Sequence, residues 1–153
     1  TATRGMGIMN SIFRGYEPLA GPILSRTSSS VVAWESGTTS TYGLKNAEER
    51  ATLFIGAGVD VYEGMVVGET PRPEDLVVNV CKKKHLTNMR SSNKDIEVRL
   101  NTPRSMSQDE MNEFLGEDEL LEVTPLNLRI RKRILDSEER GKQVKKAKEL
   151  MEE

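Results

Sequence analysis

Apolar and polar residues alternate along several short stretches of this chain, which is the period of half-buried β-strands. A turn signal at Ser36-Gly37-Thr38 separates one such stretch, residues 30–35, from a strand-like segment at 39–42, and this predicts a hairpin. Glu63-Gly64 predicts a bulge or tight bend between two further strands. Strand patterns also occupy residues 61–62, 65–68, 76–80, 96–100, 120–123 and 128–135.

Helical spacing of apolar residues appears in three places. Leu44, Ala47, Ala51 and Phe54 predict a short helix within residues 44–54. Ser107 and Glu110 form a capping-box signature, and the helix that they begin is predicted to end at Gly116. Asp136 is placed to cap a final charged helix. The capping-box helix is predicted to turn three apolar side chains inward: Met111, Phe114 and Leu115.

These elements predict an α+β fold, namely a small, mainly antiparallel, barrel-like sheet with one or two packed helices and a long basic loop. A Ser/Thr-rich stretch at residues 25–30 is the best candidate for a domain boundary. The division expected is a fragment at 1–24, a domain at 25–136 and a charged helix at 137–153. Because the sequence opens without Met and in the middle of a pattern, we expect a piece of a longer protein.

Composition limits the chemistry that the chain can perform. With 153 residues, 36% apolar and 30% charged, the chain suits one domain with a modest core. No apolar run approaches the roughly 20 residues that cross a membrane, so we expect no membrane partner. A sole histidine, His85, excludes a multi-histidine metal centre, and no phosphate-binding loop is present. We therefore expect no cofactor and no catalytic residues in this chain.

Cys81 is the only cysteine, so no internal disulfide forms and a reducing compartment is indicated. Three lysines follow it, and their charge would lower the thiol pKa and favour a nucleophile. A small buried thiol at the end of an apolar strand is the favoured interpretation. An enzyme acting through Cys81 is the third hypothesis for this chain.

Charge is strongly segregated, although the net charge is only −2. Residues 82–104 contain seven Lys or Arg against two acids, and residues 105–123 contain seven acids and no base. Residues 128–148 are basic again, with nine Lys or Arg against three acids. Strand alternation would place Arg129, Arg131 and Arg133 on one face, about 7 Å apart, which suits RNA phosphates. An edge strand kept soluble by charge, or paired with the acidic segment, explains the pattern equally well.

Residues 82–94 have almost no apolar periodicity and predict a long basic loop. Its cations would neutralise phosphates, while Thr87 and Asn88 would reach sugars or base edges and Met89 would pack on a base. Loops this long and polar are uncommon unless they are functional or disordered, and composition leaves both open. The candidate RNA-binding residues here are Lys82, Lys83, Lys84, His85, Thr87, Asn88, Met89, Arg90, Ser91, Ser92 and Lys94.

Several of these motifs resemble the TypA/BipA translational GTPases. The run from Lys84 to Ser92 is similar to the loop signature of that family, and the similarity continues in order from about Thr3 to Asp136. The motifs that carry it are Thr3–Gly7, Val61–Glu69, Arg72–Asn79, Asp118–Pro125 and Leu128–Arg133.

The resemblance implies a C-terminal, ribosome-binding module preceded by the last strand of an elongation-factor-G-like fifth domain. GTP and Mg²⁺ would belong to a GTPase domain upstream of this chain. In the family, the long loop approaches the peptidyl transferase centre and the acceptor end of A-site tRNA. The parent proteins are linked to large-subunit assembly and to translation under stress. The implied partners are large-subunit rRNA, A-site tRNA and ribosomal proteins. The resemblance also implies a monomer that acts in bacterial cytoplasm or in plastid stroma.

A second hypothesis also stays open, namely that the chain is a protein-interaction domain. In that case the acidic helix and the basic strand would bind other proteins. Phosphate contacts weaken steeply with salt whereas an apolar interface does not, so salt dependence separates the two hypotheses.

Overall fold

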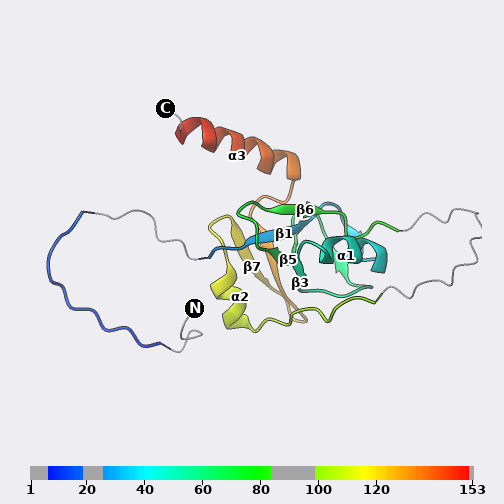
Figure 1. The fold of residues 1–153 in the computed structure, drawn as a ribbon, viewed down its shortest axis with the longest axis horizontal. Helices are drawn as coiled ribbons and strands as arrows, with labels where there is room; N and C mark the ends of the chain where they lie inside the picture. The colour runs from blue at the N-terminus through cyan, green and yellow to red at the C-terminus, as the bar shows by residue number, and fades with distance from the viewer. Residues whose placement is uncertain (1–6, 19–25, 84–98, 152–153) are drawn as a thin grey trace, which may run out of the picture.

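The computed structural model describes residues 7–18, 26–83 and 99–151 (Figure 1). Residues 7–18 carry no helix or strand. The remaining described residues form eight strands and three helices. In chain order these are β1 (Ser29–Ala33), β2 (Gly37–Thr38), α1 (Thr41–Glu48), β3 (Thr52–Leu53), β4 (Asp60–Val61), β5 (Val66–Thr70), β6 (Leu76–Val78), α2 (Gln108–Phe114), β7 (Glu119–Val123), β8 (Leu128–Lys132) and α3 (Ser137–Met151).

The largest sheet has four strands in the order β3-β5-β1-β6. β1 pairs antiparallel with β5 and parallel with β6, and every residue of β1 is buried. The pairs β2-β4 and β7-β8 form separate antiparallel ladders. The α+β class is confirmed, but the predicted barrel is wrong, because no sheet among the described residues closes on itself. β2 and β4 have two residues each and pair only with each other, so they cannot join the ends of the larger sheet.

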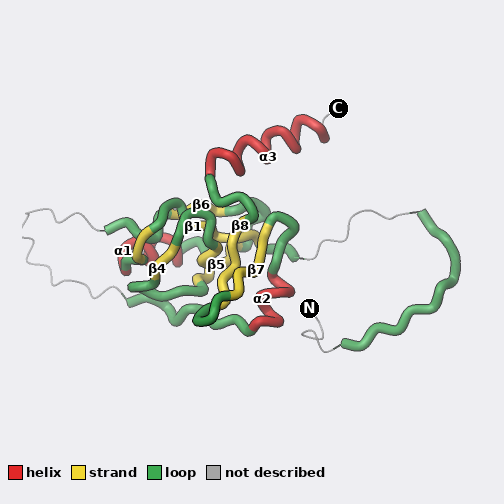
Figure 2. Tube along the Cα trace, turned by 180° about the vertical axis from the view of Figure 1, so that it is seen from behind, coloured by secondary structure: helices red, strands yellow, loops and turns green. Residues whose placement is uncertain are grey.

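Two layers cover the faces of the four-stranded sheet (Figures 1 and 2). On one face α1 packs Leu44 and Ala47 against a cluster that includes Val31 and Val67. On the other face α2 and the β7-β8 hairpin form a second cluster around Val66, Phe114 and Ile130. Phe54 meets Phe114 edge-to-face there, with the ring centroids 5.4 Å apart, an arrangement that aromatic pairs prefer.

The predicted hairpin of residues 30–35 and 39–42 is only half right, because the second segment is not a strand. The Ser40 hydroxyl accepts a 3.0 Å hydrogen bond from the Gly43 amide and begins α1 at Thr41. This N-cap overrides the strand preference of its Thr and Tyr neighbours. The helix predicted within 44–54 therefore starts and ends earlier, and the chain returns to strand at Thr52.

Helix α2 confirms the capping box. The Glu110 amide donates to the Ser107 hydroxyl at 3.3 Å, and the Ser107 amide donates to the Glu110 carboxylate at 2.8 Å. Phe114 is buried as predicted, but the helix ends there and Leu115, instead of Gly116, follows as its C-cap. The predicted strands at 120–123 and 128–135 correspond to β7 and to β8, which is shorter than expected.

Glu63-Gly64 forms a tight turn, as predicted. Gly64 has φ +84°, and an added Cβ would lie 2.7 Å from the Leu135 Cα, so the position needs glycine on two counts. Asp136 caps α3 as predicted, since its carboxylate accepts from the Glu139 amide at 2.8 Å. In Figure 1, α3 stands apart from the rest of the domain, beyond β6. None of the described helices has the length and apolar content needed to cross a bilayer.

Two strand predictions fall wholly or partly on residues that the structure does not describe. Ile96 and Val98 lie outside the described residues, and Leu100 is in no strand although it packs against the first core cluster. In the strand that the resemblance implies at the motif Thr3–Gly7, residues 3–6 also lie outside the described residues, and Gly7 is in no strand.

Candidate nucleic-acid interface

Of the basic loop, residues 82–94, only the first two residues are described. Lys82 and Lys83 are exposed, and the next described residue is Arg99. The other candidate residues of the loop lie outside the described residues: Lys84, His85, Thr87, Asn88, Met89, Arg90, Ser91, Ser92 and Lys94.

The N-terminal end of the loop is held by the cap of α1. Ser40 donates its hydroxyl proton to the Lys82 carbonyl and its backbone N–H to the Val80 carbonyl. Gly43, one turn further on, lies so close to this segment that an added Cβ would be 2.5 Å from the Val80 carbonyl oxygen. The first turn of α1 therefore fixes residues 80–82 where the loop leaves the sheet.

Two residues that follow the undescribed stretch, Arg99 and Asn101, are held by the same helix. Lys45 Nζ donates to the Arg99 carbonyl at 3.2 Å and to Glu48 Oε2 at 2.9 Å. The Glu48 carboxylate in turn accepts from the Asn101 amide through Oε1. The hydrogen bond from Lys45 is the main cause that holds the pKa of Glu48 below its usual value, so the carboxylate stays ionised at neutral pH.

A shallow open groove of about 410 Å³ lies between α1 and β6 beside Lys82. Its lining combines the cations Arg50 and Lys82 with the acid Glu49, two asparagines and small or apolar residues of α1 and β6. The lining residues include Asn46, Ala47, Val78 and Asn79.

The arginine strand is only partly available to a partner. Arg129 and Arg131 are half-buried and Arg133 is exposed. β8 pairs along its whole length with the acidic strand β7, where Arg129 lies opposite Glu122. The Tyr62 hydroxyl donates to Glu122, and burial together with this hydrogen bond raises the pKa of Tyr62 to about 12. The pairing with the acidic segment, which the sequence left open, is therefore present.

Arg133 follows the end of β8 and is the best exposed of the three arginines. Its guanidinium donates to the Glu117 carbonyl at 3.2 Å, which holds it near the acidic turn before β7. The three guanidinium groups thus have different surroundings: Arg129 and Arg131 alternate with the buried Ile130 and Lys132 in β8, and Arg133 lies beyond the end of the strand.

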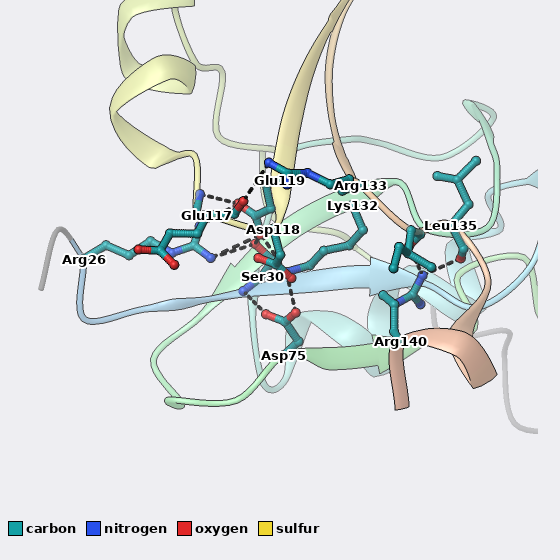
Figure 3. Close-up of polar contacts among 12 residues, drawn as sticks. Arg26, Ser30, Asp75, Glu117, Asp118, Glu119, Lys132, Arg133, Leu135 and Arg140 are labelled. Atoms are coloured by element: carbon teal, nitrogen blue, oxygen red, sulfur yellow. Dashed lines mark hydrogen bonds and ion pairs between the residues drawn. The ribbon is translucent and has the colours of Figure 1, made fainter. Parts of the chain in front are cut away.

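Sequence reasoning missed a buried ion-pair network that joins β1, β7 and β8 (Figure 3). The side chain of Lys132 is 2% exposed and that of Glu119 is fully buried. These two residues face each other across the β7-β8 ladder, with Nζ and Oε1 2.9 Å apart. Lys132 also contacts the carboxylates of Asp75 and Asp118, and the Ser30 hydroxyl donates to Glu119.

The partners keep both central groups charged. Burial alone would raise the pKa of Glu119, but hydrogen bonds from Ser30 and Gly116 and the charge of Lys132 lower it overall. Burial alone would lower the pKa of Lys132, but its hydrogen bonds to Asp118 and Asp75 raise it overall. The alternation that placed Leu128 and Ile130 inward also placed Lys132 inward, so a lysine on the apolar face was the signal to notice.

Arg26, which precedes β1 and is the first described residue after residues 19–25, joins the same network. Its guanidinium donates to both Glu119 oxygens at 3.1 and 3.2 Å and lies over the Phe114 ring, with Cζ 4.3 Å from the centroid. It also donates to the Phe114 carbonyl. The start of the domain is therefore held against the end of α2.

Cys81 is half-buried, and the pKa of its thiol is raised, whereas a reactive cysteine needs a lowered pKa. Burial raises the pKa of the thiol, and the negative charge of Glu35 adds to the effect. The lysines that follow do not reverse this. The thiol is therefore protonated at neutral pH, which supports the structural interpretation over a nucleophile.

Comparison with known proteins agrees with the resemblance in the motifs. The model of the TypA/BipA C-terminal domain matches residues 28–137. The chain is 46% identical over 147 residues to the large ribosomal subunit assembly factor BipA of Bacillus subtilis, covering 95% of this chain and 24% of that protein. It is 51% identical over 130 residues to a chloroplastic, TypA-like putative elongation factor of Arabidopsis thaliana, covering 85% of this chain and 19% of that protein.

The domain is thus of the C-terminal type found in ribosome-related factors, not a GTPase domain. The chain belongs to the TypA/BipA family. It spans about a quarter or less of the length of these curated relatives, which come from a bacterium and a chloroplast.

Proposed function

We propose that this chain is the ribosome-binding C-terminal module of a translational GTPase. Its basic loop, residues 82–94, would contact large-subunit rRNA and the acceptor end of A-site tRNA near the peptidyl transferase centre. The observation that carries the proposal is the cation-rich segment between residues 82 and 104, in which the Lys82 carbonyl accepts from Ser40 at the cap of α1 and the Arg99 carbonyl accepts from Lys45 in α1. The name of the Bacillus subtilis relative, a large ribosomal subunit assembly factor, supports the same target.

The proposal extends to the longer protein that the family membership implies. GTP and Mg²⁺ would bind a domain upstream of this chain, and residues 1–24 would complete an elongation-factor-G-like domain. The protein would act in large-subunit assembly and in translation under stress, in bacterial cytoplasm or plastid stroma. The module itself would contribute recognition and no chemistry.

Arg133 and the half-buried Arg129 and Arg131 form a second, weaker candidate for RNA contact. Arg133 is exposed, but Glu122 and the Glu117 carbonyl lie beside the strand and reduce its net positive field. We place the main RNA contacts on the loop for this reason.

A protein-interaction domain is the alternative, with ribosomal proteins as the natural partners. Its support is the exposed acidic first turn of α2, where Asp109 lies beside the capping box. Such an interface would use the acidic helix and the β8 strand together.

Binding to purified bacterial large ribosomal subunits tests the proposal. The triple variant Lys83→Ala/Lys84→Ala/Arg90→Ala should bind more weakly and flatten the plot of log affinity against log salt by about 0.7–0.9 for each phosphate that is no longer neutralised. Lys142→Ala/Lys145→Ala/Lys146→Ala on α3 is the matched control, because it removes three exposed cations far along the chain from the loop. Equally weakened binding by both variants would mean that only net charge matters.

A neutral substitution adds a second test of the same loop. Asn88→Ala removes hydrogen bonds but no charge, so it should lower affinity by about 1–2 kcal/mol and leave the salt slope unchanged. If the loop variants bind like the unmodified chain while Arg129, Arg131 and Arg133 prove essential, RNA recognition belongs to β8.

A further inference from the structure

The four-stranded sheet ends at β6, and one side of this strand is open. β6 pairs with β1 in parallel and is the last strand in the order β3-β5-β1-β6. In Figure 1 it lies at the margin of the sheet, and α3, which stands apart, lies beyond it. An uncovered edge strand offers unpaired N–H and C=O groups to another extended chain.

Val77 is the residue of β6 whose backbone faces the open side. The Trp34 amide donates to the Val78 carbonyl at 2.9 Å, so the backbone polar groups of Val78 point toward β1. Because backbone direction alternates along a strand, the N–H and C=O of Val77 point away from β1. Within the described part of the chain, no hydrogen bond reaches the Val77 backbone. One donor and one acceptor are thus available at the edge.

The strand lacks the features that commonly prevent pairing at a sheet edge, namely a charged side chain, a proline or a bulge. β6 has the sequence Leu-Val-Val and a regular register with β1. Leu76 and Val78 pack in the core cluster on the α1 face of the sheet. Alternation therefore turns the Val77 side chain to the other face, where it is 39% exposed. An uncharged, β-branched edge favours the addition of a strand.

Helix α1 borders this open edge and leaves the groove of about 410 Å³ beside it. Residues 77–79 line one side of the groove, and one face of α1 lines the other. Gly43, Asn46 and Ala47 form that face, because they are three and four residues apart. Two of these three residues are small, so α1 leaves room beside the strand. An extended chain in the groove can pair with Val77 on one side and contact α1 on the other.

The charges along the groove select the chain that fits. Arg50 and Lys82 are exposed in its lining, where Glu49 is the one acid. Within the described residues, Arg50 and Lys82 form hydrogen bonds only through their backbone groups. Both cationic side chains are therefore available to carboxylates. A phosphate backbone has no N–H groups to donate to the Val77 carbonyl, which favours a peptide over RNA.

We propose that the β6 edge and α1 form a binding site for an extended, acidic peptide segment of a partner protein, which adds to the sheet as a fifth strand. Hydrogen bonds to the Val77 backbone hold the main chain of the peptide, and Arg50 and Lys82 pair with its carboxylates. The site goes beyond the proposed function and is independent of RNA contact by the basic loop, with which it shares only Lys82.

A synthetic hexapeptide of alternating Val and Glu, acetylated and amidated at its ends, is the probe. Titrated into the full chain, it should bind with a Kd below about 1 mM and slow hydrogen exchange of the Val77 amide, while β8 amides stay unchanged. The same peptide with every amide N-methylated keeps its side chains but has no donors, so it should bind at least about fivefold more weakly. A peptide with Lys in place of Glu should also bind more weakly.

Two variants with matched controls test the two halves of the site. Val77→Pro removes the outward N–H and no bond to β1, a change that edge strands tolerate, and should weaken peptide binding at least about fivefold. Val77→Ala keeps that N–H and should bind like the unmodified chain. Lys82→Glu should weaken binding by about twofold to fivefold, the value of an exposed ion pair, and Lys142→Glu on α3 should not.

Three results would overturn the proposal: no binding at millimolar peptide, equal binding of the N-methylated peptide, or equal binding by Val77→Pro. If Val77→Pro does not fold, the N-methylated peptide and Lys82→Glu still decide. If hexauridylate displaces the peptide with equal or higher affinity, RNA occupies the groove and the proposal is wrong. Binding of the loop triple variant to large ribosomal subunits bears only on the proposed function, so the two can fail separately.

Discussion

Around Lys132 the central ion-pairing side chains are almost completely buried, whereas the Lys45 side chain in α1 is 43% exposed. In both regions one lysine is shared among several oxygen acceptors: three carboxylates for Lys132, and the Glu48 carboxylate and the Arg99 carbonyl for Lys45. In the interior, charges without partners are strongly unfavourable, so the Lys132 network stabilises the fold only while it is complete. At the surface, solvent compensates for a missing partner, so the Lys45 contacts contribute little to the stability of the fold.

The strongest test of this contrast is Lys132→Met. Removing the ammonium leaves Glu119 and Asp75 without their shared partner inside the domain, and we expect a decrease of about 3–5 kcal/mol in the free energy of unfolding. Urea denaturation followed by circular dichroism measures it. Lys82→Met, the same change at an exposed lysine, should shift stability by no more than about 0.5 kcal/mol. A decrease below about 1 kcal/mol for Lys132→Met would mean that the network does not matter for the fold.

The pH dependence of stability should come largely from the same network. The pKa of Glu119 is lowered on folding, so its contribution is complete above the unfolded value of about 4.3 and is lost as pH falls through the lower folded value. The pKa of Lys132 is raised, so its contribution is complete below about 10.4 and is lost as pH rises through the higher folded value.

The free energy of unfolding, measured from acid to alkaline pH, should therefore be flattest between these limits. Glu119→Gln should reduce the fall on the acid side, whereas Glu49→Gln should retain it. If the free energy of unfolding of Glu119→Gln falls at acid pH as much as that of the unmodified chain, other carboxylates cause the loss of stability in acid.

A smaller effect compares two helix caps. Ser40→Ala and Ser107→Ala each remove an N-cap hydroxyl, and each should cost about 0.5–2 kcal/mol in the free energy of unfolding. Only Ser40 also holds the loop through Lys82. We therefore expect Ser40→Ala alone to weaken binding to large ribosomal subunits, and equal binding by the two variants would contradict the role assigned to α1.

The smallest expected effect is that of Lys83→Ala on stability. Lys83 is exposed, so its removal should change the free energy of unfolding by less than about 0.5 kcal/mol while lowering ribosome affinity. Thermal melting and a binding titration on the same sample measure both. A large fall in melting temperature would mean that the loop end is part of the core.

The sequence was most informative where the determinants of structure are local. The capping box at Ser107 and the cap at Asp136 involve partners three residues apart, and both were predicted to the residue. Strand order and the failure of the sheet to close depend on pairing between distant segments, such as Val32 with Val77, which alternation does not specify.

The candidate site divides in the same way. Charge segregation identified the basic loop, and its residues from Lys84 to Lys94 remain a prediction. The hydrogen bond from the Asn101 amide to Glu48 joins residues 53 positions apart, and no periodicity signals such a contact. Lys132 could have been found, because its parity with Ile130 placed a charge on the inward face of β8.

The large sequence separation between Arg26 and Glu119 has a consequence for folding during synthesis on the ribosome. Arg26 and its partner Glu119 are separated by 93 residues. At synthesis rates of about 5–20 residues per second, roughly 5 to 20 seconds pass between the appearance of the first and of the second. β1 and its neighbours in the four-stranded sheet can begin to collapse during that time, because all four strands precede Glu119 and Lys132 in the chain. The buried ion pairs of Lys132 therefore form only after the β7-β8 hairpin has been translated.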